Sequence, residues 1–214
     1  DCDVQAAAKA ALLAVFDNSG QDCCARSRIL VERKIYDDVL AAMEPVVKGL
    51  SVGDPSLEST DMGPLISKIQ HDRVKSFVPD GAPIAIQGDA PTGKGFWFPP
   101  TILAPITTED TQYTNEIFGP VAVVVPFDDE ADAIAKANGT EYGLAASIFT
   151  RDIGRAIRVA RGVESGAISV NSHSSVRYWT PFGGFKQSGI GRELGPNAIE
   201  HFTELKNVFI STEI

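Results

Sequence analysis

The apolar run at residues 121–125, Val-Ala-Val-Val-Val, restricts the fold of this chain more than any other feature. Valine is branched at Cβ and favours strands over helices. An unbroken apolar run, without polar residues in alternation, is typical of a strand buried on both faces of a sheet. Residues 28–31, Arg-Ile-Leu-Val, form a shorter run of the same kind. We therefore expect a sheet that is covered on both faces.

Segments of helical period separate the predicted strands. In residues 3–17 and 34–50 the apolar side chains recur every three or four positions, as on one face of a helix. Pro45 lies inside the second segment and is expected to kink it. Predicted helices cover residues 3–17, 34–50, 70–78, 128–138 and 153–163, and predicted strands cover 28–31, 83–87, 121–125, 145–149, 167–170 and 206–212.

The alternation of strands and helices predicts the fold class. Such βαβ units give an α/β fold with an open, mostly parallel sheet and helices on both faces. Residues 171–196 interrupt the alternation with serine, glycine, aromatic and charged residues, which indicates a functional loop.

Composition and charge narrow the class of protein. The 214 residues carry a net charge of −9, so a basic face for nucleic acid is not expected. No apolar run approaches the roughly 20 residues of a membrane-spanning helix, and no signal peptide is visible. Three cysteines are too few for a disulfide framework, which favours reduced thiols and a cytoplasmic location. Because residues 1–3 already resemble a helix start, we expect a piece of a longer protein.

Cys23 is the first candidate for chemistry. It follows a Gly-containing turn between a predicted helix and a predicted strand. Backbone N–H groups on such a turn can stabilise a thiolate or an oxyanion. The alternative is a buried structural cysteine, which is the commoner fate of a free thiol. The three histidines, His71, His173 and His201, lie far apart without metal-ligand spacing, so no metal site is predicted.

Several motifs, taken in order, resemble the NAD(P)-dependent aldehyde dehydrogenase family. Residues 20–25 read Gly-Gln-Asp-Cys-Cys-Ala, residues 116–120 read Glu-Ile-Phe-Gly-Pro, and residues 181–189 read Pro-Phe-Gly-Gly-Phe-Lys-Gln-Ser-Gly. The resemblance extends over essentially the whole chain. It implies the catalytic half of such an enzyme, which oxidises an aldehyde to a carboxylic acid through a thiohemiacetal and a thioester on Cys23, with hydride transfer to NAD or NADP.

The resemblance also implies roles for residues near the cofactor and the substrate. Glu116 would bind the nicotinamide ribose hydroxyls, Phe118 would pack beside the nicotinamide, and Gln70 would approach the cofactor ribose. Asp22 and Cys24 would flank the aldehyde. The expected lining of the aldehyde channel is Val176, Phe182 and Trp179, of which Trp179 is added for its size and its place in the loop.

The implied domain organisation is a catalytic domain over residues 1–201 and a C-terminal oligomerisation strand over residues 202–214. The family's dinucleotide-binding domain, its general-base Glu and its oxyanion-hole Asn have no counterpart in the sequence. We therefore expect the isolated chain to have little dehydrogenase activity. We also expect it to form a homo-oligomer, either a dimer or a tetramer. Three other functions stay open: a non-catalytic oligomerising domain, a cofactor-independent cysteine esterase, and a reductase acting on acyl thioesters.

Overall fold

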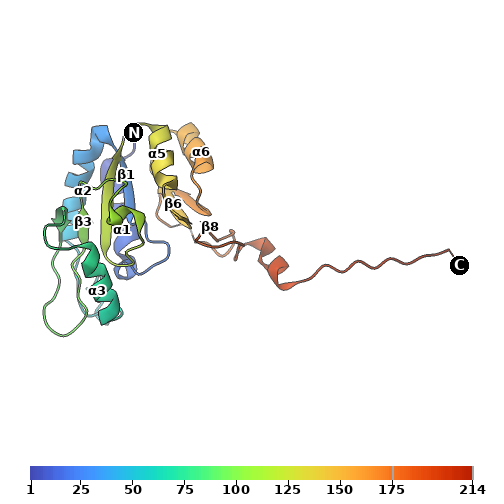
Figure 1. Cartoon of the computed structure of the whole chain (residues 1–214), viewed down its shortest axis with the longest axis horizontal. Coiled ribbons are helices and arrows are strands. Elements are labelled where there is room, and N and C mark those ends of the chain that lie inside the picture. The colour runs from blue at the N-terminus through green and yellow to red at the C-terminus, as the bar shows by residue number, and fades with distance from the viewer. Residues whose placement is uncertain (175, 214) are drawn as a thin grey trace.

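The strand β4 (Val121–Phe127) lies in the interior of the main sheet. The structure is a computed structural model, and it describes residues 1–174 and 176–213 (Figure 1). This sheet has four strands in the order β1-β4-β3-β2. The strands β1, β4 and β3 are parallel, and β2 is antiparallel to β3. The other three strands are β1 (Arg28–Glu32), β2 (Ile84–Gln87) and β3 (Thr101–Leu103).

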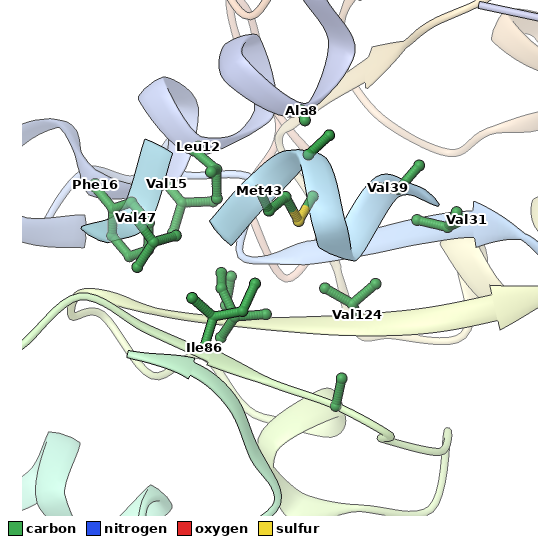
Figure 2. Packing of buried hydrophobic residues seen from close by; sticks show 14 of the residues in the cluster. Ala8, Leu12, Val15, Phe16, Val31, Val39, Met43, Val47, Ile86 and Val124 are labelled. Carbon is green, nitrogen blue, oxygen red and sulfur yellow. The ribbon is translucent and has the colours of Figure 1, made fainter. Parts of the chain in front are cut away.

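Both faces of β4 are buried, as the valine-rich run predicts. Ala122 and Val124 pack in one cluster with the apolar sides of α1 (Val4–Phe16) and α2 (Tyr36–Lys48) (Figure 2). Val121, Val123 and Val125 point into a second cluster, which includes residues from α3 and α4. Those two helices are α3 (Lys68–Phe77) and α4 (Thr111–Thr114).

The second half of the chain adds two smaller sheets. Strand β6 pairs with β7 in parallel, and β5 pairs with β8 in antiparallel fashion. The elements are α5 (Glu130–Asn138), β5 (Tyr142–Gly143), β6 (Ala145–Ile148), α6 (Ile153–Gly162), β7 (Ala167–Val170) and β8 (Phe185–Lys186). The described residues also form three 3-10 helices: η1 (Asp17–Gly20), η2 (Arg33–Ile35) and η3 (Pro196–Phe202).

The α/β class and the five predicted helices are confirmed. Polar side chains cap four of these helices at the N-terminus: Asp3, Ser67, Asp129 and Asp152. Each accepts a hydrogen bond from an orphan backbone N–H of the first turn. Pro45 lies in the last turn of α2, and its carbonyl accepts from the N–H of Gly49.

Other predictions need correction. Strand β3 and helix α4 were not predicted, because both are shorter than the windows in which periodicity is visible. The strand predicted over residues 206–212 is not formed in the described part of the segment: it runs away from the body of the protein without a partner strand (Figure 1). Ile214 lies outside the described residues. Among the helices that the structure describes, none has the length and hydrophobicity of a membrane span.

Candidate active site

A sharp turn after α1 brings Cys23 to the surface. Asn18, Ser19 and Gly20 all have positive φ, at 49°, 59° and 69°. Non-glycine residues rarely adopt this left-handed region, so two such residues in succession mark a strongly constrained turn. The chain then passes through Cys23 and Cys24 and enters β1 at Arg28.

Gly20 makes the closest contact of this turn. A Cβ atom on Gly20 would lie 2.0 Å from the carbonyl oxygen of Gly119, far inside contact distance. The backbone of the cysteine turn therefore rests directly on the loop at residues 116–120. Two motifs that are far apart in the sequence meet at this point.

Side chains fix the turn to a third segment. The hydroxyl of Ser19 donates to the carbonyl of Gly63 at 2.8 Å. The Gln21 side-chain oxygen accepts from the N–H of Ile66 at 3.1 Å. These two bonds hold the turn on both sides of Gly20, so two other segments of the chain, residues 63–66 and the loop at residues 116–120, position Cys23.

The two adjacent cysteines lie in different environments. Cys23 is exposed, whereas Cys24 is buried, with 8% of its surface exposed. Their sulfur atoms are 3.9 Å apart, and the N–H of Cys24 donates to Asp22 Oδ1 at 2.9 Å. Burial, together with the neighbouring Cys23 and Asp22, raises the pKa of Cys24 to about 12. Cys24 therefore stays a neutral thiol at physiological pH, and Cys23 is the accessible sulfur of the pair.

The loop at residues 116–120 is held by α3. Gln70 Nε2 donates to the carbonyls of Phe118 at 2.7 Å and of Ile117 at 3.3 Å. Arg73 Nη2 donates to the carbonyl of Glu116 at 2.7 Å. Phe118 has a φ of 58°, a strained value for an aromatic residue that these bonds support. The side chain of Glu116 is left exposed.

These contacts give Gln70 a role that the sequence did not indicate. Its amide group is bonded to the backbone of the Glu116 loop, and its place beside the cofactor ribose stays a prediction. Its direct effect here is on the conformation of Phe118. The sequence does not indicate whether an amide side chain bonds to backbone or to a ligand. The contact of Gln70 with the Glu116 loop is therefore seen only in the structure.

The residues predicted to line the aldehyde channel lie on the loop at residues 171–196. Phe182 exchanges two backbone hydrogen bonds with Glu193, each of 2.8 Å. Trp179 is 57% exposed and packs edge-on against Tyr178, and Val176 is also exposed. In the part of the chain that the structure describes, no hydrogen bond or ring contact joins these three residues to the cysteine turn.

One cluster could offer ligands to a metal ion. Within the described residues, the only group of three such side chains is Asp22, Cys23 and Cys24, whose ligand atoms lie within 4.8 Å of one another. His71 does not take part, since it packs edge-on against Phe98. The cluster coincides with the cysteine turn itself.

The model of the "Aldehyde dehydrogenase family" matches residues 1–208 of this chain. The chain belongs to the aldehyde dehydrogenase family. An aldehyde dehydrogenase of Aspergillus niger is 42% identical over 212 residues, which cover 97% of this chain and 43% of that protein. A betaine aldehyde dehydrogenase of Sinorhizobium fredii is 41% identical over 217 residues, covering 98% of this chain and 45% of that protein.

Solved structures of the family agree with the fold. The Mycobacterium tuberculosis aldehyde dehydrogenase complexed with NAD+ has a TM-score of 0.93 at 39% identity, covering 100% of this chain and 45% of that one. The NAD+ complex of the Bacillus cereus enzyme has a TM-score of 0.94 at 38% identity, covering 100% and 44%. This aldehyde dehydrogenase chain thus spans less than half the length of these relatives.

Proposed function

We propose that this chain supplies the nucleophilic thiol of an enzyme that oxidises an aldehyde to a carboxylic acid with NAD or NADP. The observation that carries the proposal is the contact between two motifs: the exposed Cys23 turn rests, through Gly20, on the Glu116 loop. A thiol nucleophile and a carboxylate suited to a ribose diol are thereby held on two backbone segments that are in direct contact.

The chemistry of the thiol follows from its exposure. The Cys23 thiolate adds to the aldehyde carbon, and the new carbon–sulfur bond gives a tetrahedral thiohemiacetal. Loss of a hydride from this carbon and of a proton from its hydroxyl group leaves a thioester on Cys23, which water cleaves to release the carboxylic acid and the thiol. The nicotinamide, when bound, supplies the acceptor for that hydride. Because Cys24 is buried and protonated, it is not a competing nucleophile.

The residues of the Glu116 loop fit the ribose end of such a cofactor. The exposed Glu116 carboxylate can accept hydrogen bonds from both hydroxyls of a ribose diol. We assign Phe118 to the nicotinamide side and Gln70, which also supports the loop, to the ribose end of the cofactor. The NAD+ complexes of the two similar structures favour the same class of cofactor.

We assign the aldehyde side to Asp22 and Cys24, next to the nucleophile, and to Val176, Trp179 and Phe182 on the 171–196 loop. Phe182→Ala and Val176→Phe in a complete enzyme should change the ranking of kcat/KM across small, branched and aromatic aldehydes. Roughly 1–3 kcal/mol, or 10- to 200-fold, is typical when a pocket gains or loses an apolar group. An unchanged ranking for both variants would place the pocket elsewhere.

The 214-residue chain alone should produce little or no NADH from aldehydes. The family's general base and dinucleotide-binding domain have no counterpart in its sequence, and the loss of a positioned base alone costs on the order of 10²- to 10⁴-fold in rate. The measurement is the appearance of NADH absorbance with a panel of aldehydes. A complete enzyme that includes this chain serves as the control, and robust turnover by the chain alone would contradict this expectation.

We propose that the C-terminal segment joins a neighbouring subunit of a dimer or tetramer. Val208, Phe209 and Ile210 are 70%, 86% and 77% exposed, so three consecutive apolar side chains lack cover in the single chain. Removal of residues 206–214 should therefore weaken self-association, which sedimentation velocity at several concentrations measures. A strictly monomeric intact chain, or an oligomer unaffected by the deletion, would rule this out.

The three free cysteines favour a cytoplasmic location, which cell fractionation can test.

A further inference from the structure

The turn that carries the nucleophile also holds a second sulfur atom and a carboxylate. The side chains of Asp22, Cys23 and Cys24 bring their ligand atoms within 4.8 Å of one another. We propose that these three residues, called the dithiol site below, bind one soft divalent metal ion such as Zn²⁺ or Cd²⁺, and that the bound ion blocks Cys23 reversibly. Metal binding is independent of the dehydrogenase chemistry, and only the inhibition of turnover rests on the proposed function.

A β-turn brings the two sulfur atoms close together. In an extended strand, successive side chains point to opposite faces. Here the N–H of Ala25 donates to the carbonyl of Asp22 at 3.0 Å, which closes a turn with Cys23 and Cys24 at its two central positions. The two sulfur atoms are 3.9 Å apart. The backbone conformation sets this distance, so the pair of sulfur ligands is formed before an ion binds.

The distance between the sulfur atoms is that expected for two ligands of one tetrahedral ion. Zinc binds thiolates at about 2.3 Å with tetrahedral geometry, which places two such sulfur atoms about 3.8 Å apart. The 3.9 Å between Cys23 and Cys24 is close to this value. A carboxylate oxygen about 2.1 Å from the same ion would lie about 3.6 Å from each sulfur. Asp22, within 4.8 Å of both sulfurs, therefore needs only a small movement to complete a site with three protein ligands.

The charges of the cluster suit a soft cation. The N–H of Cys24 donates to Asp22 Oδ1 at 2.9 Å and holds the carboxylate beside the sulfur atoms. A bound metal ion deprotonates a coordinating thiol, so each ion releases two protons to solvent, one from each sulfur. Arg26 donates to the carbonyl of Cys24 and adds a positive charge nearby. In the filled site, the ion and Arg26 together balance the charges of Asp22 and the two thiolates.

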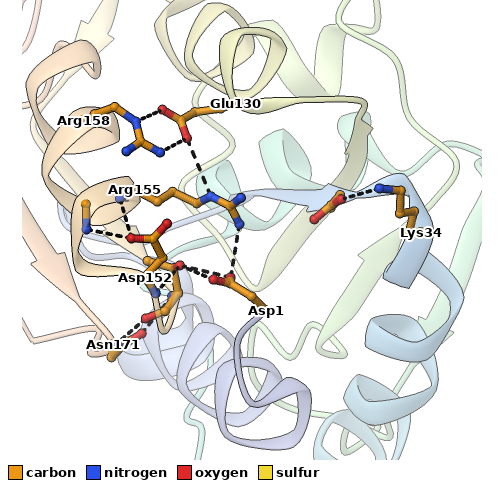
Figure 3. Close-up of polar contacts among 10 residues, drawn as sticks. Asp1, Lys34, Glu130, Asp152, Arg155, Arg158 and Asn171 are labelled. Carbon is orange, nitrogen blue, oxygen red and sulfur yellow. Dashed lines mark hydrogen bonds and ion pairs between the residues drawn. The ribbon is translucent and has the colours of Figure 1, made fainter.

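The acidic side chains around α6 do not compete for such an ion. Glu130 forms an ion pair with Arg158 at 2.8 Å, and Asp1 forms one with Arg155 at 3.4 Å (Figure 3). Asp152 accepts from two backbone N–H groups at the start of α6. These carboxylates already have partners, and oxygen ligands alone favour hard cations such as Mg²⁺ or Ca²⁺. Thiolate ligands favour soft ions, which selects the dithiol site for Zn²⁺ or Cd²⁺.

The ion can reach the dithiol site and would block the nucleophile. Asp22 and Cys23 are exposed, so the ion can approach them from solvent, and Cys24 supplies a buried ligand beside them. A Cys23 sulfur that is bound to a metal ion cannot add to a carbonyl carbon or to an alkylating reagent. Removal of the ion by a chelator restores the free thiol, so this block is reversible.

The test is a cadmium titration of the reduced 214-residue chain, followed by the ultraviolet charge-transfer absorbance of cadmium–thiolate bonds. We expect one ion per chain, the absorbance of two bound thiolates, and displacement of cadmium by Zn²⁺ but not by Mg²⁺. With the site filled, labelling of Cys23 by iodoacetamide should slow by at least about tenfold and recover after a chelator is added.

Variants identify the ligands. Cys24→Ala should halve the absorbance and weaken cadmium binding by at least about tenfold, since even groups outside the ligand shell contribute about 10- to 100-fold to metal affinity. Asp22→Asn keeps an oxygen that can accept from the N–H of Cys24. It should weaken binding by a similar factor and leave the absorbance of the filled site unchanged. Cys2→Ala is the matched control, because Cys2 is a free cysteine outside the turn, and should bind cadmium as the unaltered chain does.

Several results would overturn the proposal. They are the absence of a cadmium–thiolate band at millimolar cadmium, an unchanged affinity and absorbance in Cys24→Ala, and loss of the band in Cys2→Ala. A ratio of one ion to two chains would also overturn it, since the ion would then bridge two copies. A complete enzyme that keeps its turnover while the ion protects Cys23 from alkylation would contradict the proposed function and leave the dithiol site intact.

Discussion

Replacing Cys23 by alanine in a complete enzyme that contains this chain should abolish aldehyde oxidation, with a loss in kcat of at least about 10⁴-fold. The thiol is the only group assigned to form the covalent bond to the substrate carbon, and its neighbour cannot take over. Cys24 is buried, and its pKa of about 12 keeps it protonated. Steady-state rates with a panel of aldehydes give the measurement.

Cys24→Ala is the matched control for this variant. It removes a sulfur atom 3.9 Å from the Cys23 sulfur but leaves the nucleophile in place. We expect activity to persist, with a changed preference among aldehydes because the wall beside the nucleophile is smaller. A Cys24→Ala enzyme that is as inactive as Cys23→Ala, while still folded by circular dichroism, would contradict the assignment.

Replacing Gly20 by alanine should destabilise the fold and displace the cysteine turn. The added Cβ would lie 2.0 Å from the Gly119 carbonyl oxygen, so the turn or the Glu116 loop must move. Overpacking of this kind costs about 1–3 kcal/mol in the free energy of unfolding. Chemical denaturation measures this cost, and the rate of Cys23 alkylation reports the displacement.

Gly81→Ala separates the clash from backbone strain. Gly81 also has a positive φ, 84°, but a Cβ atom there would meet nothing within 4 Å. Both variants place a side chain at positive φ, which strains the backbone. Only Gly20→Ala adds a steric clash with the Gly119 carbonyl. Equal destabilisation of the two variants would mean that the contact between the cysteine turn and the Glu116 loop is not tight.

The main elements could be predicted because their signals are local. The valine-rich run predicts β4, and the side chains of α1 and α2 show the helical period in the sequence. Strand β3 has three residues, too few to show a period. The C-terminal segment has a strand-like sequence, but a strand also needs a partner, and none of the strands that the structure describes pairs with this segment.

The candidate site could be predicted only in part. The motif at residues 20–25 identifies Cys23, and the structure adds that this residue is exposed while Cys24 is not. The contact of Gly20 with Gly119 and the bonds from Gln70 to the Glu116 loop join segments that are distant in the sequence. No local pattern encodes such contacts, so the sequence alone does not predict that Gln70 bonds to the Glu116 loop.

The most direct test of the central claim, that Cys23 is the reactive thiol, is limited alkylation of the native 214-residue chain with iodoacetamide, followed by peptide mass mapping. Burial raises the pKa of Cys24 above its ordinary value, so its thiol stays protonated as the pH rises from 7 to 10. Labelling of Cys24 should therefore remain low across this range, and labelling of Cys23 should be dominant. In denaturant all three cysteines, Cys2, Cys23 and Cys24, should react. The account predicts that Cys23 is labelled in preference to Cys24 in the folded protein, and preferential labelling of Cys24 would contradict it.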